Sequence, residues 1–135
     1  EVTGLQTELD NLDDAQKAAY KDDVAKINGA INAINNPAKG KDTIKDATAE
    51  YVKGLIALNK LKAKINLDQA AAAAKEKAPN GGKDIDDATN KAKDKIDGLP
   101  NDVSPTDKVD KIINDINAAE QAGKSDINSA ENNSV

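Results

Sequence analysis

The sequence contains no arginine, histidine, cysteine, methionine, tryptophan or phenylalanine. Without cysteine no disulfide can form, and without cysteine and histidine the usual zinc ligands are missing. Catalysis through an imidazole or a thiolate is excluded for these 135 residues. The absence of arginine also removes the bidentate clamp for phosphate and carboxylate groups. We therefore expect a protein that is not an enzyme, with no catalytic residues, no cofactor and no bound metal.

Nucleic acid and membranes are not expected partners. The formal net charge is -5, and lysine and aspartate are interspersed along the chain, so there is no basic field for a phosphate backbone. The longest apolar run is Ala70–Ala74, which is far below the roughly 20 residues of a membrane span. The chain also starts without a methionine, which favours a piece of a longer protein.

The residues that are present favour helices. Alanine, lysine, aspartate and asparagine number 23, 19, 18 and 15. Isoleucine, leucine and valine number only 26, which is close to the lower limit for a globular domain, so a disordered chain is an alternative. The aliphatic residues recur at helical intervals rather than at random, and this regularity predicts a folded all-α protein.

Three helices are predicted in the first half of the chain. Residues 1–10 form a short helix with Leu5 and Leu9 on one face, and the row from Val24 to Ile34 predicts a helix over 12–36. Asn36 and Pro37 end this helix. The third helix covers 42–66, and its apolar face should be the centre of the core. That face consists of Ile44, Ala47, Tyr51, Leu55, Leu58 and Ile65.

Three helices are predicted in the second half as well, over 67–78, 84–98 and 105–131. Residues 79–82, Pro-Asn-Gly-Gly, separate the first two. Gly98 and Pro100 end the second, and Ser104 followed by Pro105 and Asp107 resembles a capping box that opens the third. An echo supports repetition, since Ile44-x-Asp-Ala-Thr48 matches Ile85-x-Asp-Ala-Thr89.

These predictions divide the chain into two modules, 1–66 and 67–135. The expected architecture is an elongated, spectrin-like tandem of three-helix bundles. Nothing breaks the helical pattern between 42 and 77, so one long helix of about 54 Å shared by both modules is an open alternative. Whether residues 79–82 form a rigid turn or a hinge also stays open.

The segment from Leu9 to Leu61 resembles a known family. Leu12-Asp-Asp-Ala-Gln-Lys-Ala-Ala-Tyr20, followed by Ile44-x-x-Ala47 and then Leu55, Leu58 and Leu61, is similar to the three-helix FIVAR and GA-type repeats of giant Gram-positive surface proteins that bind extracellular matrix. Residues 83–130 look like a more diverged repeat. The albumin-binding face of the GA pattern has no counterpart here.

The resemblance implies a cell-wall-attached, extracellular protein in which neighbouring repeats of the same chain follow one another. Its implied role is a stalk or spacer that projects an adhesive region. The alternative is an adhesive module that binds a host matrix or plasma protein, such as fibronectin, or a glycan, through an exposed helix face. A desiccation- or lipid-responsive helix former, unfolded in water, is a third hypothesis.

No side chain in the sequence is a compelling binding residue, so the binding site is unknown. The two tyrosines, Tyr20 and Tyr51, lie on apolar stripes and are expected in the core with the hydroxyl at its edge. Three acidic pairs do not follow the calcium-loop pattern and should be solvated. These pairs are Asp13/Asp14, Asp22/Asp23 and Asp86/Asp87. The basic spot at Lys75, Lys77 and Lys83 is neutralised by Glu76 and Asp84, and Asn132-Asn133-Ser134 matches a glycosylation sequon.

Overall fold

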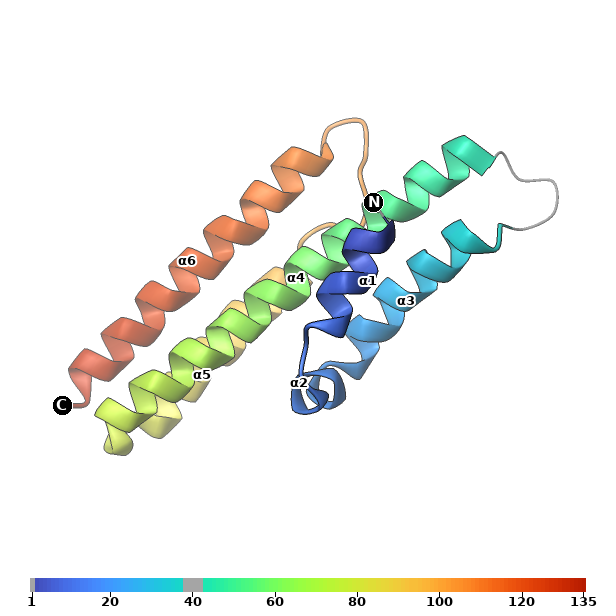
Figure 1. Ribbon diagram of the computed structural model, residues 1–135. Helices are drawn as coiled ribbons and strands as arrows, with labels where there is room; N and C mark the ends of the chain where they lie inside the picture. Colours follow the sequence, from blue (N-terminus) through green and yellow to red (C-terminus); the bar gives the residue numbers. More distant parts are fainter. Residues whose placement is uncertain (1, 38–42) are drawn as a thin grey trace. The chain divides into compact units, whose positions relative to one another are not determined.

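The protein is all-helical over the residues that the computed structural model describes, 2–37 and 43–135 (Figure 1). This confirms the prediction of an all-α protein. The elements in chain order are α1 (Val2–Asp10), α2 (Asp14–Ala19), α3 (Lys21–Asn35), α4 (Thr43–Lys77), a 3₁₀ turn η1 (Pro79–Gly81), α5 (Gly82–Asp97) and α6 (Val109–Asn133).

The helix predicted over 12–36 is interrupted. Asp13 caps α2, because its Oδ1 accepts a hydrogen bond from the Gln16 amide at 2.7 Å while the Gln16 side chain accepts one from the Asp13 amide at 3.1 Å. Tyr20 then leaves the helical conformation, with φ -119° and ψ 38°, and separates α2 from α3. The prediction of one unbroken helix was therefore wrong at Tyr20.

Helix α4 is a single helix of 35 residues (Figure 1). The break predicted between 66 and 67 does not occur, and the alternative of one long helix is the one observed. The physical reason is that residues 55–77 contain neither glycine nor proline, so the backbone hydrogen bonds continue. The predicted start at Asp42 lies outside the described residues.

The helix predicted over 105–131 begins later, at Val109. Ser104 caps a turn instead: its Oγ accepts from the Asp107 amide at 2.9 Å, and its own amide donates to the Asp107 carbonyl at 2.9 Å. The Asp107 carbonyl therefore accepts a hydrogen bond from Ser104, within the turn that precedes α6. Helix α5 begins two residues before its predicted start at 84 and ends one residue before its predicted end at 98.

The contacts divide the chain into two compact units. Unit 1 consists of Glu1–Leu61 and Pro100–Asp110, and unit 2 of Lys62–Leu99 and Lys111–Val135. The division between Leu61 and Lys62 lies inside α4. The division into modules 1–66 and 67–135 stays a prediction.

The core of unit 1 is built from α1, α3 and the first part of α4. Gly54 is the point of closest approach, since a Cβ placed there would lie 3.0 Å from both Ala30 Cβ and Leu5 Cδ1. The buried apolar side chains of unit 1 are Leu5, Leu9, Ile27, Ala30, Ile31, Ile56, Leu58 and Leu61. Ile44 was expected at the core and is instead 81% exposed, so that prediction was wrong.

The core of unit 2 is built from the last part of α4, α5 and α6. Gly123 is its point of closest approach: a Cβ there would lie 2.6 Å from Ala92 Cβ and 2.7 Å from Leu67 Cδ2. The buried apolar side chains of unit 2 are Ala63, Ile65, Leu67, Ala71, Ala74, Ala78, Ile85, Ala92, Ile96, Ile112, Ile116, Ala119 and Ile127. Both cores are thus narrow aliphatic seams with alanine and glycine where the helices come closest.

Candidate functional site

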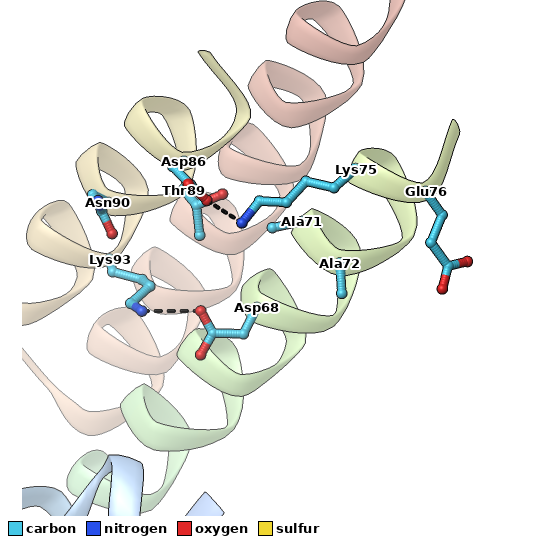
Figure 2. A pocket seen from close by; sticks show the side chains of 9 residues that line it. All are labelled: Asp68, Ala71, Ala72, Lys75, Glu76, Asp86, Thr89, Asn90 and Lys93. Carbon is cyan, nitrogen blue, oxygen red and sulfur yellow. Dashed lines mark hydrogen bonds and ion pairs between the residues drawn. The ribbon is translucent and has the colours of Figure 1, made fainter. Parts of the chain in front are cut away.

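A groove lies between α4 and α5 in unit 2 (Figure 2). It has a volume of about 660 Å³ and is open to solvent. Ala71 and Thr89 are buried at its base, and the Thr89 hydroxyl donates to the Ile85 carbonyl at 2.7 Å. The complete lining is Asp68, Ala71, Ala72, Lys75, Glu76, Asp86, Thr89, Asn90 and Lys93.

Two ion pairs cross this groove. Lys93 Nζ donates to Asp68 Oδ1 at 2.9 Å, and Lys75 on α4 pairs with Asp86 on α5. Figure 2 shows both pairs joining the two helices, with Glu76 turned away from them. In each pair a lysine of one helix neutralises an aspartate of the other, so these four charges are balanced across the groove.

A third pair joins the same two helices closer to the end of α5. Lys64 Nζ donates to Asp97 Oδ1 at 2.7 Å, and the Lys64 side chain is only 5% exposed while that of Asp97 is 54% exposed. The burial of an ammonium group is unfavourable unless it is paired and hydrogen-bonded. The pair therefore fixes the end of α5 against α4.

Sequence reasoning missed these pairs, although a signal for them was present. The pairs 64/97, 68/93 and 75/86 are placed symmetrically about the turn at 79–82. A hairpin of antiparallel helices brings such positions opposite one another, so the predicted break at 79–82 already implied these partners. The acid and base alternation was interpreted only as solvated surface.

The tyrosines are both half-buried. Tyr20 lies at the junction of α2 and α3, and Tyr51 lies on α4 within unit 1. Neither lines the groove in unit 2, so the structure does not bring the two aromatic residues to that site.

The acidic pairs do not come together as a metal site. Asp13 serves as a helix cap, Asp86 pairs with Lys75, and Asp87 pairs with Lys83. Across residues 2–37 and 43–135, no group of three or more acidic side chains is arranged to hold a metal ion. These carboxylates are explained by the helix ends and the ion pairs that they form.

Two lysines of the predicted basic spot form ion pairs with different aspartates: Lys75 pairs with Asp86, and Lys83 pairs with Asp87. Lys83 on α5 donates to Asp87 Oδ2 at 2.7 Å, one helical turn further on. This hydrogen bond, together with the negative charge of Asp87, raises the pKa of Lys83 above its ordinary value. The site is fully exposed, so the pair is a surface feature rather than a binding centre.

The sequon at the end of α6 contains a residue with a packing role. The Ser134 hydroxyl donates to the Ala130 carbonyl at 2.9 Å. A Cβ at Gly81 would lie 2.5 Å from Ser134 Oγ, so glycine at 81 makes room for this serine. The last residues of the chain therefore pack against the α4–α5 turn.

Two smaller hollows are lined by residues of unit 1, mainly from α3 and α4. They share Glu50 and Lys53, whose side chains form an ion pair at 3.2 Å. Both linings combine alanine with polar and charged side chains.

None of the helices described is long and apolar enough to pass through a bilayer. In the same part of the chain, every buried side-chain nitrogen or oxygen has a hydrogen-bond partner.

Comparison of the chain with protein-family models, with curated proteins and with solved structures finds no match. The arrangement of residues is therefore the basis for any functional conclusion.

Proposed function

We propose that the chain is a non-enzymatic repeat segment of a bacterial cell-surface protein and acts as a stalk or spacer. In this proposal the two units are three-helix bundles arranged in an elongated, spectrin-like tandem. The protein is attached to the cell wall of a Gram-positive cell and projects an adhesive region outward. The resemblance to FIVAR and GA-type repeats is part of the proposal.

The observation that carries the proposal is the course of α4. The helix contributes Ile56, Leu58 and Leu61 to the core of unit 1 and Ile65 and Leu67 to the core of unit 2. The chain thus passes from unit 1 to unit 2 between Leu61 and Lys62 without leaving this hydrogen-bonded helix, which is about 52 Å long for its 35 residues. It passes between the units again at Leu99–Pro100, after α5, and at Asp110–Lys111, within α6. A helical connection suits a spacer, because it resists bending better than a flexible linker does.

The surface chemistry supports the same role. The ion pairs 64/97, 68/93 and 75/86 link helices within unit 2, so these charges stabilise the bundle. The remaining exposed lysines and aspartates favour solubility over a defined ligand. A substrate site would require several polar groups directed at one point.

Distance measurements between spin labels test the stalk directly. The chain has no cysteine, so labels attach only where cysteines are introduced. Thr48→Cys with Ala73→Cys labels two exposed positions on α4 that straddle the unit boundary. An intact helix gives one narrow distance near 37 Å, at about 1.5 Å per residue.

The matched control lies within α6. Asn114→Cys with Asn132→Cys labels exposed positions that belong to one unit, with an expected separation of about 27 Å. A broad distribution for the α4 pair beside a narrow one for the α6 pair means that the connection bends freely. The stalk proposal would then be wrong.

An adhesive module is the second candidate, and the groove of unit 2 favours it. The groove displays Glu76 and Asn90, both exposed, beside the two ion pairs. Its ligand would be a host matrix or plasma protein, or a glycan. The test is capture from plasma, saliva and mucus on the immobilised protein, read by mass spectrometry.

A double variant, Glu76→Lys with Asn90→Lys, is the control for the capture experiment. It changes two exposed groove residues and leaves both ion pairs in place. Saturable capture that the variant loses establishes the adhesive role of the groove. A folded protein that captures nothing leaves the stalk as the function.

A further inference from the structure

The dipeptide Asn-Gly occurs twice in the sequence, as Asn28-Gly29 and as Asn80-Gly81. An asparagine in this setting is prone to lose its side-chain amide, because the following glycine has no Cβ to keep its backbone nitrogen away from the asparagine side chain. Both asparagines are exposed to solvent. The two sites therefore share their local chemistry, and the backbone that holds each of them makes the difference.

The backbone at Asn28 opposes the reaction. The Gly29 amide would have to turn toward Asn28 Cγ, and this movement is incompatible with the helical conformation. Gly29 lies in the interior of α3 (Lys21–Asn35), where each amide donates to the carbonyl four residues earlier. The reaction therefore requires the helix to open in its middle, with the loss of hydrogen bonds on both sides.

The backbone at Asn80 is held more weakly. Asn80 lies in the 3₁₀ turn η1, where the Gly81 amide donates to the Ala78 carbonyl at 2.9 Å, only three residues earlier. A hydrogen bond of this kind has poorer geometry than an α-helical one. Pro79 has no amide hydrogen and adds no bond to the turn. Opening of the bond to Ala78 thus frees the Gly81 amide for attack on the side chain.

Gly81 is also the place where the end of α6 packs. Gly81 is buried, and a Cβ there would lie 2.5 Å from Ser134 Oγ and 2.6 Å from Ser134 Cβ. Ser134 is held in turn by its hydroxyl, which donates to the Ala130 carbonyl at 2.9 Å. A change in the path of the backbone at Gly81 is therefore felt at the end of α6.

We propose that Asn80 is a site of spontaneous deamidation in the folded protein, and that its isoaspartate product releases the end of α6 from the α4–α5 turn. The Gly81 amide nitrogen bonds to Asn80 Cγ, the bond from Cγ to the side-chain nitrogen breaks, and ammonia leaves with the proton of the Gly81 amide. Water then opens the cyclic imide at either carbonyl and gives aspartate or isoaspartate. The inference goes beyond the stalk function and does not depend on it.

The two products differ in their effect on Ser134. Aspartate keeps the backbone path and adds a negative charge close to the N-terminus of α5, where the helix dipole favours it. Isoaspartate carries the chain through the former side chain and lengthens the backbone by one methylene group just before Gly81. Because the contact has no room for even a Cβ at Gly81, the longer backbone cannot keep this glycine in place against Ser134.

Ageing of the full chain in mildly alkaline buffer tests the site. Cleavage after lysine places Asn80 in the peptide 78–83 and Asn28 in the peptide 27–39, so mass spectrometry with fragmentation follows both reactions in one sample. The same ageing in urea gives the rate of each reaction in the unfolded chain. The ratio of the unfolded to the folded rate then measures how strongly the fold protects each asparagine.

Protection should be at least about tenfold weaker at Asn80 than at Asn28, which corresponds to about 1.4 kcal/mol in the free energy of local opening. Asn80→Gln is the matched control, because the longer side chain forms a cyclic imide far more slowly. It should abolish the reaction in the peptide 78–83 and leave the rate in the peptide 27–39 unchanged. Equal protection at the two sites, or stronger protection at Asn80, would overturn the proposal.

Hydrogen exchange measures the effect on α6. Aged protein should lose protection of the amides at 130–134 in proportion to its isoaspartate content, whereas Asn80→Gln aged in the same way should keep it. Asn80→Asp carries the new charge without the longer backbone and should resemble fresh protein. If aged protein kept this protection, or if Asn80→Asp lost it equally, the release of α6 by isoaspartate would be refuted.

Discussion

Replacing Gly123 by alanine should destabilise the protein, although alanine is the better helix former. In an open helical position this substitution stabilises by about 0.5–1 kcal/mol. At Gly123 the new Cβ would lie 2.6 Å from Ala92 Cβ and 2.7 Å from Leu67 Cδ2, whereas ordinary contacts begin at 3.4 Å. Because the Ala92 Cβ cannot rotate away, the helices must move apart.

The magnitude follows from opposing terms. Insertion of a methyl group into a well-packed seam costs about 1–3 kcal/mol. The gain in helix propensity offsets about 1 kcal/mol of this cost. We therefore expect Gly123→Ala to lower the free energy of unfolding by up to about 2 kcal/mol in net terms.

Gly29 provides the matched control, since it lies within α3 and a Cβ at this position would have no atom within 4 Å beyond the backbone of its own helix. Gly29→Ala should raise the free energy of unfolding by about 0.5–1 kcal/mol, because only the propensity term acts there. Urea unfolding monitored by far-UV circular dichroism measures both variants. If Gly123→Ala were as stabilising as Gly29→Ala, the close approach of α6 to its neighbours would be refuted.

Three further predictions concern the polar contacts. Asp97→Ala should lower the free energy of unfolding by about 1–3 kcal/mol in urea denaturation, because buried Lys64 loses a charged partner; an unchanged urea midpoint would contradict this. Asp13→Ala should cost about 1 kcal/mol through the lost cap of α2, and protection of the α2 amides from hydrogen exchange should fall. The pKa of Lys83 is raised above 10.5 by Asp87, so the pair stabilises the fold below that pH and loses its effect as pH rises through the raised pKa. In Asp87→Asn an NMR titration of Lys83 Nζ should show the pKa returning toward 10.5, and a pKa that stays raised would exclude Asp87 as the cause.

The helical periodicity of the aliphatic residues was sufficient to predict an all-α protein. The row from Val24 to Ile34 and the Pro-Asn-Gly-Gly sequence at 79–82 are local signals, and both are found as α3 and as the turn between α4 and α5. Such signals act through neighbouring residues in the chain, which a sequence displays directly.

The interruption at Tyr20 had no such signal. Residues 13–28 contain neither proline nor glycine, so helix propensity alone favours continuation. The late start of α6 was also not signalled by the sequence. Ser104 and Asp107 are residue types typical of a helix start, but here they form hydrogen bonds with each other in a turn. Tertiary packing decides such cases, since propensities differ by less than the energy of a buried contact.

The sequence by itself determined the helical class, the main turn and the absence of the side chains needed for thiol or imidazole chemistry. Only the tertiary structure decided that Ile44 is exposed, that Lys64 is buried against Asp97, and that Gly54 and Gly123 lie where helices approach closely. The reason is that periodicity depends on residues a few positions apart. Burial and close approach depend on partners 24 or more residues away, such as Ala30 for Gly54 and Asp97 for Lys64.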